Sequence, residues 1–380
     1  MVISRRNFLR RVGGGAALGA VAPSLGGFAH ADGCPLSGSR HPGGPIFLDR
    51  NENADGPSER VMGAMRDRLA RAHLFPRSDP DALGDQLALL HAVRPDQVVL
   101  GCGSSDILRM AAAAFLGPGT SLILSAPSFD AIVQYARGAG ADVSAVPLTR
   151  QHAHDLESMS HRTNAATRLV YLCNPNNPTG SLTPRGDLEA FIRRLPAATH
   201  VVVDEAYHHY VGGSSTYASF IDHPLDDRRL IVTRTFSKIH GLAGLRIGYA
   251  IAAPQTARRL LSHRVEDGVN VVAAAAALAA LDDPEYLRLS ADRNTDRREE
   301  FFNQANARML RAIDSHTNFV MLNAGRPAGG VVEHFKHNNI LLPPPFVPMR
   351  THVRVSLGTP PDMAEFWRVW DLMPPHTMEM

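Results

Sequence analysis

The run of three valines at Val201–Val203 constrains the fold more than any other feature of the chain. An uninterrupted β-branched run predicts a strand that is buried on both faces, and such strands occur in parallel sheets covered by helices on each side. The run ends at Asp204, and in open α/β sheets the carboxyl ends of the strands border the crevice where ligands bind. The sequence therefore predicts a doubly covered sheet with a carboxylate at its ligand-binding edge.

Two further segments also contain a predicted strand that ends in a turn or loop. Leu169–Gly180 opens with an apolar run and then breaks into N-P-N-N-P-T-G, through which a strand cannot continue. Val98–Leu100 leads into a Gly-Ser turn and an Ala-rich helix, where free backbone N–H groups and the hydroxyls of Ser104 and Ser105 favour an anion. Strands alternate with helices from about residue 75 to residue 254, so we predict an α/β fold with a mainly parallel sheet.

Lys238 lies in the run T-F-S-K-I-H-G-L-A-G-L-R, which extends from Thr235 to Arg246. A lysine amine that is enclosed by apolar and cationic groups has a lowered pKa, so it can attack an aldehyde and form a Schiff base. Ser237 and Arg246 supply a hydroxyl and a guanidinium for a phosphate. The only other lysine of the chain is Lys336. An aldehyde-binding lysine beside phosphate-binding groups indicates pyridoxal 5'-phosphate.

Three side chains suit the ring of that cofactor. Asp204 can keep the pyridine nitrogen protonated, so that the ring acts as an electron sink. Asn177, which stands between rigid prolines, can form a hydrogen bond with the ring hydroxyl. Tyr207, three residues after Asp204, can donate to the same oxygen. We predict that these three residues surround the cofactor ring.

With these motifs in order, the chain from about Leu48 to Gly358 resembles fold-type I pyridoxal-phosphate enzymes of the class I/II aminotransferases, closest to the histidinol-phosphate aminotransferase group. The resemblance implies a three-layer α/β/α large domain, a smaller α+β domain and a homodimer. It implies ping-pong transfer of an amino group from an amino acid, or a histidinol-phosphate-like amine, to a 2-oxo acid such as 2-oxoglutarate. The resemblance implies catalytic roles for Lys238, Asp204 and Tyr207. It implies that these three residues also contact the cofactor, together with Ser104, Ser105, Phe129, Asn177, Ser237 and Arg246. It implies that Arg354 and Asn177 contact the substrate.

Two departures from the family pattern concern the substrate. Phe75 stands where the family usually has a tyrosine that reaches the cofactor phosphate of the neighbouring subunit. The histidinol-phosphate enzymes tend to carry a second arginine after an apolar strand, but here that strand runs into Pro343–Pro345. A dianionic phosphate prefers two guanidinium groups, whereas a carboxylate needs only Arg354. We therefore expect histidinol phosphate to be a poor substrate, unless another cation such as Arg350 compensates.

Other functions remain open from the residues alone. The same side chains can support decarboxylation or oxidation of an amino acid, because the bond that breaks depends on the pose of the substrate. A non-enzymatic protein that binds the cofactor is a further alternative. The 18 histidines include no set at metal-ligand spacing, so we predict no metal site. His240 is ambiguous, because it could line the cofactor pocket or be a loop histidine that faces the phosphate side.

The N-terminal segment Met1–Ala31 carries a separate signal. It reads S-R-R-N-F-L-R-R, then a weakly apolar Gly/Ala-rich stretch, then A-H-A before Asp32. This order resembles a twin-arginine export signal cleaved after Ala31, which implies the twin-arginine translocase as a partner and a periplasmic or secreted protein. Cleavage removes four arginines and no acid, so the formal charge changes from +2 to 2 − 4 = −2. We expect no binding to nucleic acid and no stable membrane association.

The mature chain is long enough for two domains. After the signal at residues 1–31, we predict an N-terminal arm that forms part of the small domain at residues 32–74. The large cofactor domain is predicted at residues 75–260 and the C-terminal small domain at residues 261–380. The cysteines are Cys34, Cys102 and Cys173, an odd number for which we expect no disulfide framework.

Overall fold

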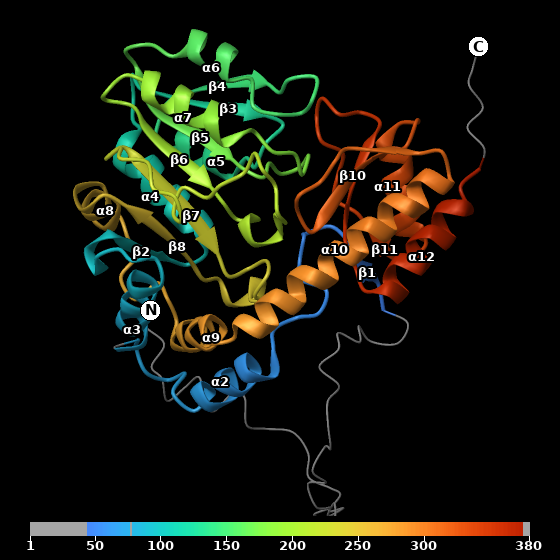
Figure 1. Ribbon diagram of the computed structural model, residues 1–380, viewed down its shortest axis with the longest axis horizontal. Coiled ribbons are helices and arrows are strands. Elements are labelled where there is room, and N and C mark those ends of the chain that lie inside the picture. Colours follow the sequence, from blue (N-terminus) through green and yellow to red (C-terminus); the bar gives the residue numbers. More distant parts are fainter. Residues whose placement is uncertain (1–43, 77, 375–380) are drawn as a thin grey trace, which may run out of the picture. The chain divides into compact units, whose positions relative to one another are not determined.

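The computed structural model describes residues 44–76 and 78–374, so the predicted export signal and Cys34 lie outside the described residues. The largest sheet has seven strands in the order β2-β8-β7-β6-β5-β3-β4 (Figure 1). β8 is antiparallel to β2 and to β7, and the other neighbouring strands are parallel. The predicted α/β fold with a mainly parallel sheet is confirmed. The strands are β2 (Val98–Gly101), β3 (Ser121–Ala126), β4 (Asp142–Pro147), β5 (Thr167–Cys173), β6 (His200–Asp204), β7 (Leu230–Thr235) and β8 (Gly248–Ala252).

The valine run explains the two-sided burial of this sheet. Val201 and Val203 belong to one apolar cluster, and Val202 belongs to another. Successive residues of a strand point to opposite faces, so each face of the sheet has its own helical cover. The first cluster includes α2 (Glu59–Leu69), α3 (Ser78–Leu90), α6 (Leu156–Arg162), α7 (Arg185–Arg194) and α9 (Val271–Leu281), and the second includes α4 (Ser104–Phe115), α5 (Ala131–Gly138) and α8 (Pro254–Leu261).

Helices α2 and α9 pack with the seven-stranded sheet. Val61 of α2 and Ala273 of α9 lie in the same apolar cluster as Val201, and α9 contacts both α2 and α3. The alanines let these helices approach closely. The boundaries that the sequence suggested at residues 74 and 260 stay predictions, but they would separate α2 and α9 from the core that both helices share with this sheet.

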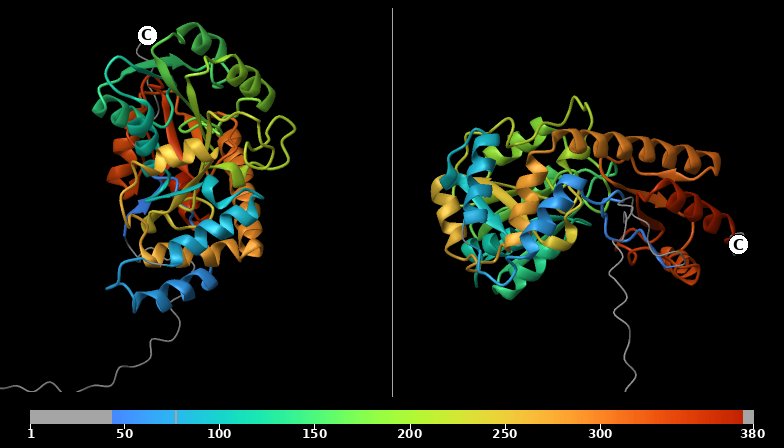
Figure 2. Two further views of the ribbon diagram at one scale, coloured as in Figure 1. Left: turned by 90° about the vertical axis from the view of Figure 1, so that its left-hand side faces the viewer. Right: turned by 90° about the horizontal axis from the view of Figure 1, so that it is seen from below.

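A second core surrounds an antiparallel sheet in the order β12-β10-β9 and a short parallel pair, β1 with β11. Phe301, Phe335 and Phe366 are fully buried there against Leu48 near the start of the described chain. The 24-residue α10 is the longest helix and is seen along its length in the right view of Figure 2. The elements are β1 (Ile46–Phe47), β9 (Arg311–Ala312), β10 (Phe319–Asn323), β11 (Ile340–Leu341), β12 (His352–Ser356), α10 (Pro284–Ala307), α11 (Ala328–His337) and α12 (Pro360–Asp371).

Within the described ranges, none of the helices combines the length and the apolar character that a membrane span requires.

Candidate active site

The carboxyl ends of β5, β6 and β7 border a pocket of about 700 Å³. The edge that the sequence predicted as ligand-binding is therefore hollow in the structure. Side chains from β12 and from the segment at residues 49–52 close the pocket from the other side. All ten residues that were predicted for the site line this one pocket: Ser104, Ser105, Phe129, Asn177, Asp204, Tyr207, Ser237, Lys238, Arg246 and Arg354.

One end of the pocket combines N–H groups, hydroxyls and a guanidinium, which suit a phosphate. Ser104 opens α4, whose first N–H groups have no partner within the helix. Arg246 donates to the Ser237 hydroxyl at 3.2 Å. The residue before the helix is Gly103 with φ 77°, and a Cβ there would lie 2.3 Å from the Arg246 guanidinium. Gly103 thus lets the guanidinium lie against the helix N-terminus, where cation and N–H groups can share an anion.

Asp204 is held rigidly at the end of β6 and is only 2 % exposed. One carboxylate oxygen accepts a hydrogen bond from the Tyr171 hydroxyl at 2.8 Å, and the other accepts from the Ala206 amide at 3.1 Å. Burial raises the pKa of Asp204, and these hydrogen bonds oppose that shift. A protonated pyridine nitrogen would supply the cation that a buried carboxylate needs, so Asp204 suits the predicted cofactor. Tyr171 was not anticipated from the sequence.

The Lys238 amine donates to the backbone carbonyls of Arg50 and Asn51, at 2.9 and 3.0 Å. Burial is the main cause that lowers the pKa of Lys238 to about 7, and the nearby Arg354 adds to the effect. At neutral pH a large fraction of the amine is therefore unprotonated and nucleophilic. The direction of this pKa shift is the one that the sequence predicted for Lys238.

Tyr207 and Asn177 are fixed by neighbours on the side of the smaller sheet. The Tyr207 hydroxyl accepts a hydrogen bond from the Asn51 amide at 3.0 Å, so its own hydrogen can be donated into the pocket. The Asn177 side-chain oxygen accepts from Arg354 at 2.6 Å, which leaves the Asn177 amide hydrogens as donors. Both residues therefore present a donor, as a ring oxygen requires. Asn51 was not predicted to belong to the site.

Arg354 is a buried cation on the side of the pocket that β12 forms. Its guanidinium donates to Asn177 and to the backbone carbonyl of Asp49, and it lies 5.4 and 5.1 Å from the ring centroids of Phe319 and Phe346. Its Nε has no hydrogen-bond partner among the described residues. Burial lowers the pKa of Arg354, so an anion that reaches the guanidinium would relieve a desolvated charge.

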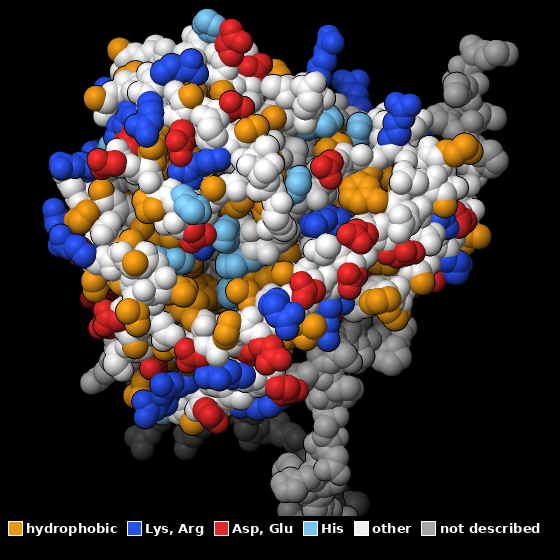
Figure 3. All heavy atoms as spheres, in the orientation of Figure 1, with side chains coloured by type: hydrophobic (Ala, Val, Ile, Leu, Met, Phe, Trp, Pro, Cys, Tyr) orange, Lys and Arg blue, Asp and Glu red, His pale blue; other side chains and the backbone are white. Residues whose placement is uncertain are grey.

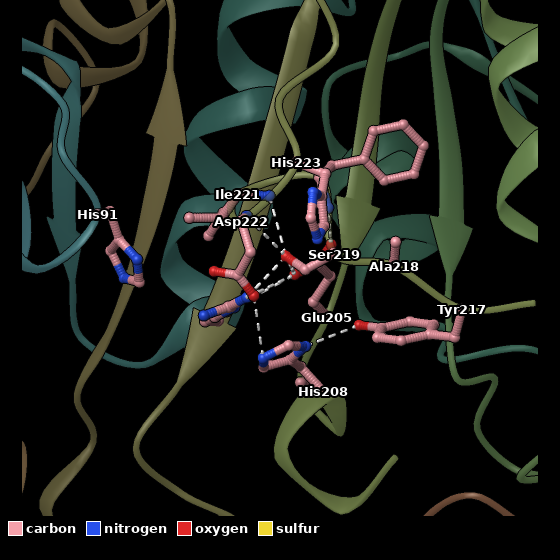
Figure 4. A network of polar contacts seen from close by, with 12 residues as sticks. His91, Glu205, His208, Tyr217, Ala218, Ser219, Ile221, Asp222 and His223 are labelled. Carbon is pink, nitrogen blue, oxygen red and sulfur yellow. Dashed lines mark hydrogen bonds and ion pairs between the residues drawn. The ribbon is translucent and has the colours of Figure 1, made fainter. Parts of the chain in front are cut away.

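A polar network supports the opposite side of the β6 and β7 ends (Figure 4). Glu205 and Arg234 are almost fully buried and form an ion pair at 3.2 Å. Arg234 also donates to Ser219 at 2.6 Å and to Asp222 at 3.1 Å. His208 lies 3.4 Å from Asp222, at the edge of the network. Because Glu205 follows Asp204 directly, this network helps to position the carboxylate in the pocket.

We expect Glu205→Ala to lower the free energy of unfolding by about 3–5 kcal/mol, because Arg234 would keep a buried charge without its main partner. Asp222→Ala serves as the control, since the Asp222 side chain is 44 % exposed and should cost about 1 kcal/mol or less. Equilibrium denaturation in urea measures both. A loss below about 1 kcal/mol for Glu205→Ala would contradict the role given to the ion pair.

Three other sequence interpretations can be compared with the structure. His240 is buried against Phe236 and His209, at ring-centroid distances of 4.9 and 5.4 Å, and does not line the pocket. Arg350 does not line it either, whereas Arg50 does. Across residues 44–76 and 78–374, histidine, cysteine and carboxylate side chains form no group that could hold a metal ion.

Comparisons with known proteins identify a family for the chain. Residues 44–369 match the family model of aminotransferase class I and II. The chain is 38 % identical over 323 residues to a histidinol-phosphate aminotransferase of Caldicellulosiruptor saccharolyticus, covering 84 % of this chain and 89 % of that one. It is 37 % identical over 324 residues to histidinol-phosphate aminotransferase 2 of Carboxydothermus hydrogenoformans, covering 84 % and 88 %.

A solved structure with a similar fold has the same enzyme name as these relatives. A crystal structure of histidinol-phosphate aminotransferase from Sinorhizobium meliloti, in complex with pyridoxal-5'-phosphate, superimposes with a TM-score of 0.80 at 27 % identity. The alignment covers 90 % of this chain and 99 % of that one. The fold and the pocket define a fold-type I pyridoxal-phosphate enzyme. The chain belongs to the aminotransferase class I and II family and is a transaminase that depends on this cofactor. The predicted family, cofactor and enzyme class are confirmed.

Proposed function

We propose that the protein transfers an amino group from an amino acid, whose carboxylate binds Arg354, to a 2-oxo acid. The observation that carries this proposal is the single buried guanidinium of Arg354, with an unpartnered Nε, beside an apolar wall of Pro343, Pro344 and Phe346. A carboxylate matches one guanidinium fork. The two relatives described above are named for histidinol phosphate, which carries a phosphate instead of a carboxylate. A phosphate prefers a second guanidinium, and this apolar wall offers none. The proposed difference in substrate from these relatives therefore rests on the wall.

The residues divide the work of the reaction. The bound cofactor supplies an electron sink for the bond at the donor Cα. Asp204 keeps that sink protonated, and Lys238, once its amine is free, is the general base and acid that moves the proton. Arg354 orients the donor. Transamination by a ping-pong route accounts for all of these groups, and no observation favours decarboxylation, oxidation or a non-enzymatic role.

The expected donor preference can be measured. We expect kcat/KM for the best amino acid in a panel to exceed that for histidinol phosphate about ten- to a hundredfold, because a missing charge-assisted hydrogen bond costs on the order of 1.5–3 kcal/mol. Both donors are assayed with 2-oxoglutarate, and the keto product and the aminated acceptor should appear in equal amounts. A preference for the phosphate ester that is lost in Arg50→Ala would contradict the proposal and identify Arg50 as the second cation.

Residues 1–31 are proposed to direct export through the twin-arginine translocase, with cleavage after Ala31 and a periplasmic or secreted product. The support is the sequence alone, in which Arg5 and Arg6 precede a Gly/Ala-rich stretch and A-H-A. In a bacterium with this translocase, the full chain should be exported and lose residues 1–31. Export that is unchanged when Arg5 and Arg6 are both replaced by lysine would contradict the proposal.

We also propose a homodimer. Leu74 and Phe75 are 49 % and 78 % exposed, and Val265 is 59 % exposed. Pro76, next to Phe75, lines the same surface pocket as Val265, so these apolar side chains belong to one region that a second copy could cover. Sedimentation of the cofactor-loaded enzyme at micromolar concentration should give a dimer. An active monomer would contradict this.

A further inference from the structure

A second pocket, of about 480 Å³, lies outside the candidate active site. Its titratable lining residues are Arg311, Asp314, His152, His316 and His352. None of them lines the cofactor pocket. Several histidine side chains are visible in Figure 3 on the face of the molecule where β10 lies in Figure 1. Neither the transamination chemistry nor the residues assigned to it explain this collection of cationic groups.

One wall of the pocket is a row of polar side chains across the antiparallel sheet. Asn323 of β10 is in register with Arg311 of β9 on one side and with His352 of β12 on the other. Residues directly opposite each other on antiparallel strands point to the same face of the sheet. The next row, centred on Leu322, faces the apolar core instead. Register therefore places a guanidinium, an amide and an imidazole side by side.

The groups of this row are available to a ligand. Arg311 lines the pocket, and its guanidinium makes no hydrogen bond or ion pair with the described parts of the chain. The Asn323 oxygen accepts from the Gly325 amide at 3.0 Å, which leaves the Asn323 NH₂ group to donate. His352 forms one long contact with Thr351 at 3.4 Å. The row thus offers three donors, and no carboxylate belongs to it.

The facing wall adds a further imidazole and hydroxyls. His152 has φ 62°, a left-handed conformation that is uncommon for a residue other than glycine, and its ring centroid lies 6.5 Å from that of His352. The Ser181 hydroxyl donates to the His152 carbonyl at 2.6 Å and fixes this turn. Ser214 and Thr216 also line the pocket. Two imidazoles from separate parts of the chain therefore approach each other without a carboxylate between them.

The charge of the pocket favours an anion. Asp314 is its only carboxylate, and that side chain is 86 % exposed and lies 3.6 Å from His316. Arg311 supplies a guanidinium, and His152, His316 and His352 supply three imidazoles. Burial lowers the pKa of His152, and burial together with the neighbouring His152 lowers the pKa of His352. Burial thus favours the neutral form of both rings in the empty pocket, and a negative group beside them would favour the protonated form instead.

We propose that this pocket is a binding site for a small dianion, a phosphate or a dicarboxylate, held by Arg311, Asn323 and His352 from one wall and by His152 from the other. The proposal does not depend on the identity of the amino donor. Binding draws protons onto His152 and His352, because a negative ligand raises the pKa of an imidazole beside it. The affinity therefore falls as the pH rises and the imidazoles lose their protons.

Calorimetric titration of the cofactor-loaded enzyme tests the proposal, with inorganic phosphate and succinate as probes and acetate as a monoanion control. We expect one saturable site for each dianion, about tenfold tighter near pH 6 than near pH 8. Arg311→Ala should weaken binding at least about tenfold, and His352→Gln should flatten the pH dependence. Arg288→Ala is the matched control, because Arg288 is a 70 % exposed arginine of α10 that does not line the pocket.

The titrations are repeated in Arg354→Ala, which removes the guanidinium of the donor site. Dianion binding that survives Arg354→Ala but is lost in Arg311→Ala supports the proposal. Three results would overturn it: no saturable binding below about 10 mM, binding within about threefold of the parent in both Arg311→Ala and His352→Gln, or equal binding of acetate. Arg311 is exposed, so its replacement should leave the melting temperature unchanged, and thermal denaturation checks this.

Discussion

Replacement of Lys238 by alanine is expected to lower kcat more than about 10³-fold. The variant would lose both the group that is predicted to bind the cofactor covalently and the base that is proposed to move the Cα proton. Lys336 provides the control, because it is an exposed lysine on α11 paired with Glu333, and Lys336→Ala should keep full activity. Borohydride reduction of the loaded enzyme and peptide mapping should place the cofactor on Lys238. A label on Lys336, with full cofactor absorbance in Lys238→Ala, would disprove the assignment.

Lys238 should also make the rate of cofactor capture depend on pH. The pKa of Lys238 is lowered to about 7, and only the unprotonated amine attacks the aldehyde. The rate of cofactor capture by the cofactor-free protein should therefore fall about tenfold for each pH unit below 7 and level off above it. Stopped-flow absorbance between about pH 5.5 and pH 9 measures this rate. A midpoint near 10, the value of an exposed lysine, would show that burial does not activate the amine.

Replacement of Asp204 by alanine is expected to lower kcat by several orders of magnitude, with the fold retained. A charge-assisted hydrogen bond in a dry site stabilises the charge that develops on the ring, and alanine removes it. Tyr171→Phe is the matched control, since it removes only the 2.8 Å hydrogen bond to the Asp204 carboxylate and should cost far less. Turnover of Asp204→Ala within about tenfold of the parent would refute the proposed role of Asp204.

The sequence predicts the sheet well because local patterns determine it. Val201–Val203 is buried on alternate faces, and residue 204 follows at the ligand edge, as the apolar run implied. Most of the ten predicted residues share the pocket because they end or follow a strand, or open a helix, at the carboxyl edge of the sheet. Arg246 was predicted from its spacing to Lys238, and Phe129 and Arg354 from the resemblance to a family. Their individual roles stay predictions until the variants are measured.

Contacts between distant segments were not predictable in this way. Asn51 reaches Tyr207 across 156 positions of the chain, and Tyr171 reaches Asp204 across 33. A single asparagine or a tyrosine within an apolar strand carries no local signal for such a partner. The sequence also did not predict that α9 packs against α2, for a related reason. A pattern of apolar residues shows that a helix is buried, but it does not identify the helix that covers it.

The wall of Pro343, Pro344 and Phe346 belongs to the connection between β11 and β12, whereas Arg354 lies within β12. The group that we propose to hold the donor's charge is thus anchored by strand pairing, and the groups that shape the space beside it are carried by a loop. Loops tolerate changes of sequence and length far better than paired strands do. Exchange of residues 343–349 alone should therefore alter which amines the enzyme accepts while the cofactor chemistry persists, and this makes the loop the natural starting point for engineering transaminases with new donor ranges.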